Sequence, residues 1–200
     1  MTTLTASRLQ DAALARFAKQ GFDATSMNEI AADVGIKKPS VYAHFRNKEE
    51  LFLSLIPLVI EAEQEYAKST LRGGDDMKQQ LLAYLQGIEE RFNSSYRVQF
   101  WVRILLAPPV HLYDMVMDPM HIFMDDLERI LKNALQASPL VPNASQLSAD
   151  VLAMTCMSMI DSLQSELLFG GAKKYQRRLE STWAVFEAAI ASPSDGNADN

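Results

Sequence analysis

The chain has 200 residues, of which 48% are hydrophobic and 22% are charged, so its composition is that of a globular protein and excludes a disordered chain. Eight Gly and eight Pro are too few for a fibrous protein, and the longest apolar runs cover about half of a bilayer. The single cysteine, Cys156, excludes an internal disulfide framework. Because it lies in an apolar stretch, we expect it to pack as a small hydrophobe.

The first twenty residues carry the charged side chains Arg8, Asp11, Arg16 and Lys19 and contain no apolar block. A secretory signal needs such a block. We therefore expect a cytoplasmic protein with no membrane partner.

Charge is divided unevenly along the chain, whose formal net charge is -6. Residues 1–55 hold seven basic and six acidic residues, whereas the remainder holds twelve basic and nineteen acidic ones. Between Ile36 and Lys48 there are four bases and no acid. A local cationic strip in an acidic protein favours a nucleic-acid contact surface over general affinity for polyanions.

The periodicity of the apolar residues is helical. Leu9, Ala13 and Phe17 recur at a spacing of four, no strand-like alternation is present, and no hairpin turn separates apolar runs. Glycine and proline clusters divide the chain into segments of helical length. These clusters fall at residues 71–75, 107–109, 138–143 and 170–171. We predict an all-α fold of about nine helices.

Two short helices near the N-terminus have clear end signals. Ser26 and Glu29 form a capping box that begins one helix, and Gly35 can adopt the left-handed conformation that ends it. Pro39 suits the first turn of the next helix. Two short helices joined by a glycine turn, with a helix before them and bases on the second, predict a helix-turn-helix.

Residues 21–51 give this prediction more detail, because they read GFDATSMNEIAADVGIKKPSVYAHFRNKEEL. This run resembles the DNA-binding domain of the TetR family of bacterial regulators and covers about a quarter of the chain. The resemblance implies a homodimeric, ligand-responsive transcriptional regulator, a repressor released from a palindromic DNA operator. The ligand pocket described below and the acidic C-terminal region lead us to expect a small hydrophobic or amphipathic ligand, which Asp161 would suit if it is cationic. It implies no enzyme activity, cofactor or metal. We expect a helix-turn-helix domain over residues 1–47, a ligand-binding and dimerisation domain over 48–191 and a flexible tail over 192–200.

The resemblance also implies which side chains contact DNA. Tyr42, His44 and Lys48 match family positions that hold phosphates, and all three carry donors for a phosphate oxygen. The positions matching base edges, flanking backbone or the helix start are Ser26, Asn28, Lys37, Lys38, Pro39 and Ser40. The alternative is a solvated Lys37–Lys38 pair and a packing role for Tyr42.

The C-terminal region predicts an apolar ligand pocket. Seven of the ten Met lie between residues 115 and 159, and methionine lines adaptable cavities well. The predicted lining is Tyr66, Tyr84, Phe92, Phe100, Trp101, His111, Met115, Met120, His121, Phe123, Met124, Met154, Met157 and Asp161. Plain core packing is the alternative for each aromatic or Met residue. Asp161 is either a buried carboxylate suited to a cationic ligand or a solvated group at a dimer rim.

A competing pattern supports a different function class. His111, Asp114, Asp118, His121 and Asp125 would share one face of a continuous helix and could bind a metal ion. A metal-dependent helical enzyme is therefore the alternative function. Pro119 argues against a continuous helix through this segment.

Two features predict assembly and signalling. Residues 146–169 and 172–191 are expected to form the helices of a homodimer interface, with a stripe made by Tyr175, Leu179, Trp183, Phe186 and Ile190. A further helix beginning near Lys48 is expected to kink in its middle at Pro57. We expect that helix to act as a lever between ligand and DNA.

Overall fold

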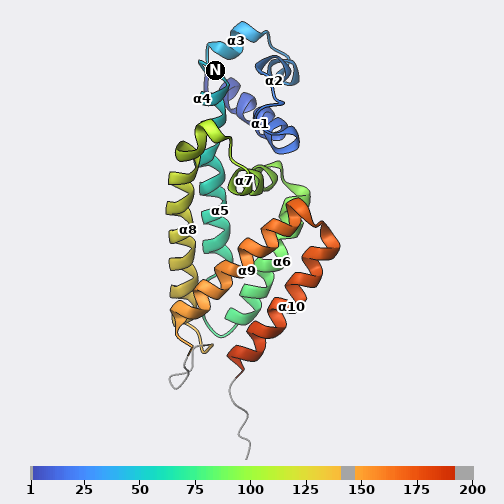
Figure 1. Cartoon of the computed structure of the whole chain (residues 1–200). Helices are drawn as coiled ribbons and strands as arrows, with labels where there is room; N and C mark the ends of the chain where they lie inside the picture. The colour runs from blue at the N-terminus through green and yellow to red at the C-terminus, as the bar shows by residue number, and fades with distance from the viewer. Residues whose placement is uncertain (1, 141–146, 192–200) are drawn as a thin grey trace, which may run out of the picture. The chain divides into compact units, whose positions relative to one another are not determined.

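The computed structural model describes residues 2–140 and 147–191, and these residues form helices and no strands (Figure 1). This confirms the all-α prediction. The predicted tail, 192–200, lies outside the described residues, as do residues 141–146 of the proline-rich break. The elements are α1 (Thr2–Gln20), α2 (Met27–Val34), α3 (Lys38–Tyr42), α4 (Lys48–Leu53), α5 (Ile56–Thr70), α6 (Met77–Ser94), α7 (Tyr96–Leu106), the 3-10 helix η1 (Val110–Leu112), α8 (Tyr113–Gln136), α9 (Ala149–Phe169) and α10 (Ala172–Ile190).

The chain divides into two compact units. The first contains residues 1–65 and 90–124, and the second contains residues 66–89 and 125–200. Helices α5, α6 and α8 each contribute to both. None of the helices over residues 2–140 and 147–191 is long and apolar enough to cross a membrane.

The N-terminal helices of the first unit form as their end signals predict. The Ser26 hydroxyl accepts the Glu29 amide and the Glu29 carboxylate accepts the Ser26 amide, so the capping box is complete. Gly35 ends α2 with φ of 72°. The apolar faces of these helices meet in a small core that contains Phe17, Ile30 and Val41, each fully buried.

An ion-pair network joins α1 to α2. Arg16 donates two hydrogen bonds to Asp33, at 2.6 and 2.8 Å, and one to Glu29 at 2.9 Å. The hydrogen bonds from Arg16 lower the pKa of Asp33. The pKa of Glu29 is also lowered, chiefly by the backbone amide of Ser26. Both carboxylates therefore stay ionised and hold the two helices together at neutral pH.

The predicted kink at Pro57 is wrong in its position. Helix α4 ends at Leu53, α5 begins at Ile56, and Pro57 lies in the first turn of α5, where its missing N–H costs no helical hydrogen bond. Gln10 of α1 donates to the Ser54 hydroxyl at 3.0 Å and fixes the break. Counted as one broken helix, α4 and α5 give the predicted total of nine α-helices among the described residues.

The expectation that Pro119 interrupts its helix is also wrong. Helix α8 runs continuously from Tyr113 to Gln136 with Pro119 inside it. Proline removes one backbone hydrogen bond from a helix, but Val116 and Met120 beside it are fully buried. We attribute the continuity of α8 to this packing, which offsets the loss.

In the second unit, α9 packs beside α10 (Figure 1). Tyr175 of α10 is fully buried and donates its hydroxyl to the Leu85 carbonyl of α6. Cys156 is buried, as expected, and this burial raises the pKa of its thiol to about 12. The thiol is therefore an inert packing group.

The left-handed turn at Gly35 can be tested by substitution. A Cβ at this position would meet no atom within 4 Å, so any effect of a side chain comes from the backbone conformation. We expect Gly35→Ala to lower the free energy of unfolding by about 1 kcal/mol, and Gly35→Asn to lower it less because Asn tolerates this conformation. Urea denaturation measures both. Equal stability of the Ala variant and the unmodified protein would contradict a left-handed residue here.

Candidate nucleic-acid interface and ligand groove

Helices α2 and α3 form a helix-turn-helix whose second helix presents polar groups to solvent. Lys37, in extended conformation, precedes α3, and Pro39 occupies its first turn. Val41 is fully buried and anchors the helix, whereas Lys38 and Ser40 are exposed. The short α3 therefore presents its outer face to solvent.

Most cationic side chains of this region bind the protein itself. Arg8 donates to the Val34 carbonyl at 2.9 Å, at the C-terminal end of α2. Arg46 pairs with Glu50 at 3.1 Å, and Arg16 is held in the network described above. These three guanidinium groups position the helices.

Lys48 has a structural role that its sequence position does not reveal. Its ammonium donates to the carbonyls of Phe22 and Thr25, at 2.8 and 3.0 Å, and lies 4.1 Å from the centroid of the Phe22 ring. Two of its three N–H donors are thus used inside the domain. The third remains for the phosphate contact that the sequence predicts.

Lys37 and Lys38 differ from the other bases. Within residues 2–140 and 147–191, neither has an ion-pair partner. The Lys38 ammonium lies 5.8 Å from the centroid of the Tyr42 ring, and Tyr42 is 43% exposed. The two ammonium groups and the phenol thus form an exposed cluster of donors on α3.

The remaining predicted DNA contacts differ in how far they are exposed. Asn28, Pro39 and Ser40 are exposed, and His44 is half-buried. Ser26 is exposed as well, but its hydroxyl already caps α2. Contact of these residues with DNA stays a prediction.

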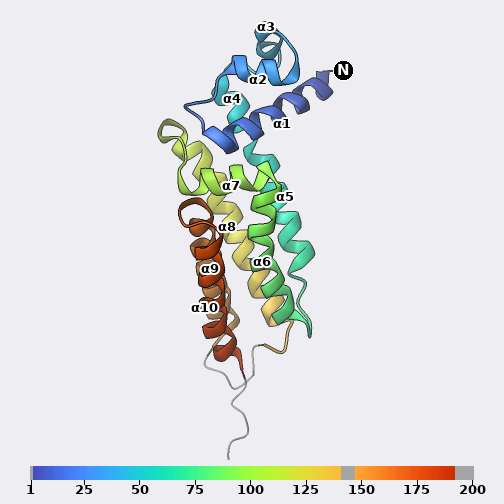
Figure 2. The same ribbon diagram turned by 90° about the vertical axis from the view of Figure 1, so that its right-hand side faces the viewer.

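No sequence signal indicated the α1–α7 joint, the contact that holds the N-terminal helices in place. Helix α7 lies directly against α1 (Figures 1 and 2). Arg103 of α7 donates to the carbonyls of Ala18 and Lys19, at 3.0 and 3.4 Å, at the C-terminal end of α1. Rings from α1, the following turn, α4 and α7 pack around one another beside it. They belong to Phe17, Phe22, Phe52 and Phe100, with centroids 5.0 to 6.4 Å apart.

A groove of about 760 Å³ separates α5 from α8 within the first unit. Eight of its lining residues are apolar and three are polar. The lining consists of Leu53, Ile56, Pro57, Ile60, Glu61, Gln64, Met115, Asp118, Pro119, Ile122 and Phe123. Phe123 forms the floor, because it is buried and packs edge-on against Trp101 at 4.8 Å.

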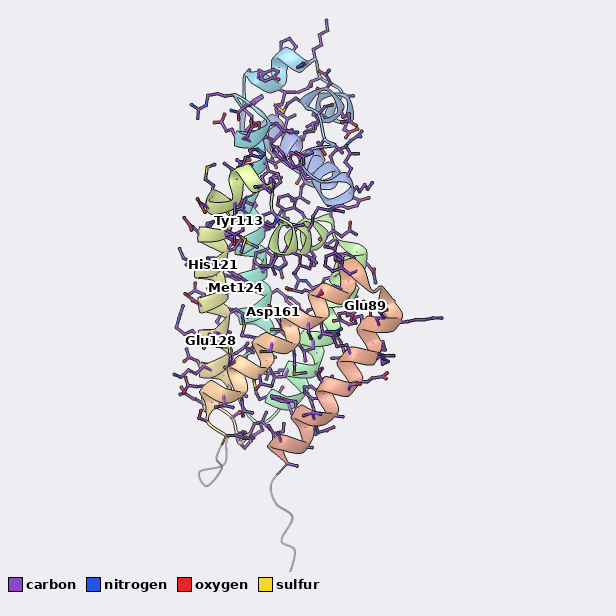
Figure 3. All side chains as sticks on the ribbon, viewed as in Figure 1. Glu89, Tyr113, His121, Met124, Glu128 and Asp161 are labelled. Carbon is purple, nitrogen blue, oxygen red and sulfur yellow. The ribbon has the colours of Figure 1, made fainter. Side chains whose placement is uncertain are left out.

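Nine of the predicted ligand residues belong to the first unit, and only Met115 and Phe123 of them line this groove. Phe100 is a core residue of the α1–α7 joint, and His111 is an exposed residue beside the Phe22 ring. His121 and Met124 follow Tyr113 along α8 (Figure 3). The others are the buried Trp101 and Met120 and the half-buried Phe92.

Five predicted ligand residues belong to the second unit. Tyr66 and Tyr84 stack with centroids 5.2 Å apart, and Met157 is buried whereas Met154 is 51% exposed. Asp161, on α9 (Figure 3), is exposed, and partial desolvation raises the pKa of its carboxyl. Of the two alternatives for Asp161, the described residues therefore favour the solvated one. A ligand role for these five residues stays a prediction.

The alternative metal site has no geometric support. His111 lies in η1, whereas Asp114, Asp118, His121 and Asp125 lie on α8. Throughout the described part of the chain, no group of three or more His, Cys, Asp or Glu side chains is placed to hold a metal ion. The alternative function, a metal-dependent enzyme, therefore has no candidate metal site among the described residues.

Helices α9 and α10 share an apolar surface groove of about 720 Å³ that Val151, Ser158, Ser162 and Val185 help to line. Val185 is 72% exposed. Of the α10 stripe that the sequence predicts as a dimer interface, only Phe186 lines this groove. The stripe members Tyr175, Leu179 and Phe186 are buried in the second unit, Phe186 at the base of the groove, because the α10 face that carries them packs inward. Trp183 and Ile190 are half-buried.

Comparison with known proteins supports the helix-turn-helix. The family model for bacterial regulatory proteins of the tetR family matches residues 9–55. The chain is similar to IcaR, the negative transcriptional regulator of the biofilm operon icaADBC of Staphylococcus epidermidis, with 27% identity over 107 residues, 50% of this chain and 54% of IcaR. It is also similar to the transcriptional activator FasR of Mycolicibacterium smegmatis, with 32% identity over 97 residues, 47% of this chain and 44% of FasR. The chain spans about half the length of these curated relatives.

Solved structures show the same fold over nearly the whole chain. A TetR-family regulator from Rhodococcus sp. has a TM-score of 0.69 at 14% identity, covering 94% of this chain and all of that one. The regulator FadR from Bacillus subtilis, solved in complex with stearoyl-CoA, has a TM-score of 0.66 at 15% identity, covering 92% of this chain and 99% of FadR. Residues 9–55 thus match the family of bacterial tetR-type regulatory proteins, and the fold of the chain is that of solved TetR-family regulators.

Proposed function

We propose that this protein is a ligand-responsive transcriptional regulator that binds a palindromic DNA operator as a homodimer and is released by a small molecule. One observation carries the proposal. Lys37 and Lys38 stand exposed and without ion-pair partners at the start of α3, whereas Arg8, Arg16 and Arg46 are bonded internally. Such free donors suit phosphates and the guanine edge in a major groove.

The relatives support this function class. IcaR is named as a negative transcriptional regulator. FasR is named as a transcriptional activator. FadR was solved with stearoyl-CoA, which supports a small-molecule effector. We propose that the regulator is a repressor, so that its release from DNA by the ligand would allow transcription. In a dimer, the two recognition helices would lie about 34 Å apart, one turn of duplex.

DNA recognition is tested by three variants. Lys38→Ala should change the preferred sequence, because a bidentate lysine–base contact discriminates by about 1–3 kcal/mol. Tyr42→Phe should weaken binding equally to all sequences, because a phosphate contact carries no sequence information. Lys173→Ala, which removes an exposed charge from α10, should change neither property. Selection from a library of duplexes followed by fluorescence anisotropy measures both, and absence of any selected sequence would refute the regulator.

We propose that the α1–α7 joint couples the ligand to DNA. A ligand can shift the orientation of the DNA-binding helices only through its difference in affinity between two conformers. Arg103 holds the C-terminal end of α1, and Gln10 holds the α4–α5 break. Both bonds would change if α7 or α5 moved.

Arg103→Gln should therefore weaken operator binding by about three- to tenfold, because a loosely held domain loses more freedom when it binds. The preferred sequence should not change. Arg97→Gln is the matched control, since Arg97 is an exposed arginine on the same helix and should leave affinity unchanged. If the two variants bind the operator equally well, the joint does not position the domain.

We propose the apolar surface groove of α9 and α10 as the homodimer interface. Its rim contains Val151 and Val185, 47% and 72% exposed in the single chain, and a second copy would cover them. Ser158 and Ser162 are small enough for close helix approach.

Val185→Asp should convert the dimer to monomer, because burying an unpaired charge in an interface is costly. Folding of each chain should be unaffected, since the residue is exposed. Val110→Asp is the control, at a valine of the first unit that is 90% exposed. Light scattering at micromolar concentration reads the mass, and a monomeric unmodified protein or a dimeric Val185→Asp variant would refute this interface.

A further inference from the structure

The groove between α5 and α8, defined above by its eleven lining residues, carries negative charge and no positive charge. Its two ionisable groups are Glu61 and Asp118, one on each wall, and both are exposed. No Lys, Arg or His lines it. In the described part of the chain, neither carboxylate has an ion-pair partner, whereas the neighbouring Glu63 is buried and paired with Arg91. The groove therefore presents two free negative charges over an apolar surface.

Two prolines of the same groove each withhold the N–H that the carbonyl of another lining residue would accept in an unbroken helix. Pro57 and Pro119 line it, and so do Leu53 and Met115, the residues four positions before them. A proline has no N–H to donate to the carbonyl oxygen four residues earlier. The Met115 carbonyl thus lacks its helical donor inside α8, and the Leu53 carbonyl lies at the end of α4, where helical donors run out. Both oxygens can accept a hydrogen bond from a ligand.

We propose that this groove binds an amphipathic amine, a protonated amino group on an alkyl or aryl-alkyl body, as the effector of the regulator. This inference rests on the proposed function. The ammonium would donate to Glu61 or Asp118 and to a free carbonyl, and the body would lie along Ile56, Ile60 and Ile122. An ammonium that carries N–H donors forms charge-assisted hydrogen bonds with such acceptors. A carboxylate or an acyl thioester would meet the like charges of Glu61 and Asp118 and no cationic side chain.

Titration calorimetry with decylamine, decyltrimethylammonium and decanoate at neutral pH, below micelle-forming concentrations, tests the chemistry. Decylamine should bind, the quaternary ion should bind about tenfold more weakly because it has no N–H donor, and decanoate should not bind. Decanoate or decanoyl-CoA binding as tightly as decylamine would overturn the proposal. So would decylamine binding that falls with rising protein concentration, since a second copy would then occupy the groove.

Matched variants locate the site. Glu61→Gln and Asp118→Asn should each weaken decylamine binding by about tenfold. Glu65→Gln and Asp114→Asn replace exposed acids on the same two helices outside the lining and should bind as the unmodified protein does. Because all four side chains are exposed, thermal melting should show equally folded proteins. Equal decylamine affinity in all four variants would overturn the groove as the site.

An operator-release assay separates this inference from the proposed function. Decylamine should release the selected duplex from the unmodified protein, with Glu61→Gln needing about tenfold more amine. If decylamine binds in the groove but leaves operator affinity unchanged, its role as effector is overturned. Failure to select any duplex would instead refute the regulator, and the calorimetry without DNA would still decide whether the groove binds amines.

Discussion

The contact between α1 and α7 is the interaction on which the arrangement of the DNA-binding helices depends. Phe17 and Phe100 bring the two helices into one aromatic core, and Arg103 fastens the C-terminal end of α1. Helix α2 is then tied to α1 through Arg16. The orientation of α3 follows from this chain of contacts, so a movement of α7 would reach the recognition helix through packed side chains.

The basic side chains of the N-terminal region have two roles: the arginines bond within the protein, and Lys37 and Lys38 are exposed to solvent. Arginine suits internal fixation because its planar group can bond several acceptors at once, as Arg16 does with Asp33 and Glu29. Lys37 and Lys38 keep their side chains exposed to solvent. An acidic chain can thus present a local DNA-binding surface without coating DNA indiscriminately.

The two prolines show where local rules stop. Sequence reasoning placed a kink at Pro57 and a break at Pro119, and both predictions were wrong. Pro57 instead begins a helix after a break fixed by Gln10, and α8 continues through Pro119 over buried neighbours. Proline excludes a hydrogen bond wherever it occurs, but tertiary packing decides whether the helix ends. Here both prolines line one groove, together with the residues four positions before them.

The sequence by itself determined the helical class, the capping box at Ser26, the turn at Gly35 and the helix-turn-helix, because these depend on residues a few positions apart. Tertiary structure alone decided which apolar stripe is core. Phe186 was assigned to an interface and is buried within its own unit, since a helix with apolar residues on several sides does not specify which side faces inward. Tertiary structure also decided the internal hydrogen bonds of Lys48 and the position of the groove beside Glu61. Their partners are distant in sequence, and only the folded chain brings them together.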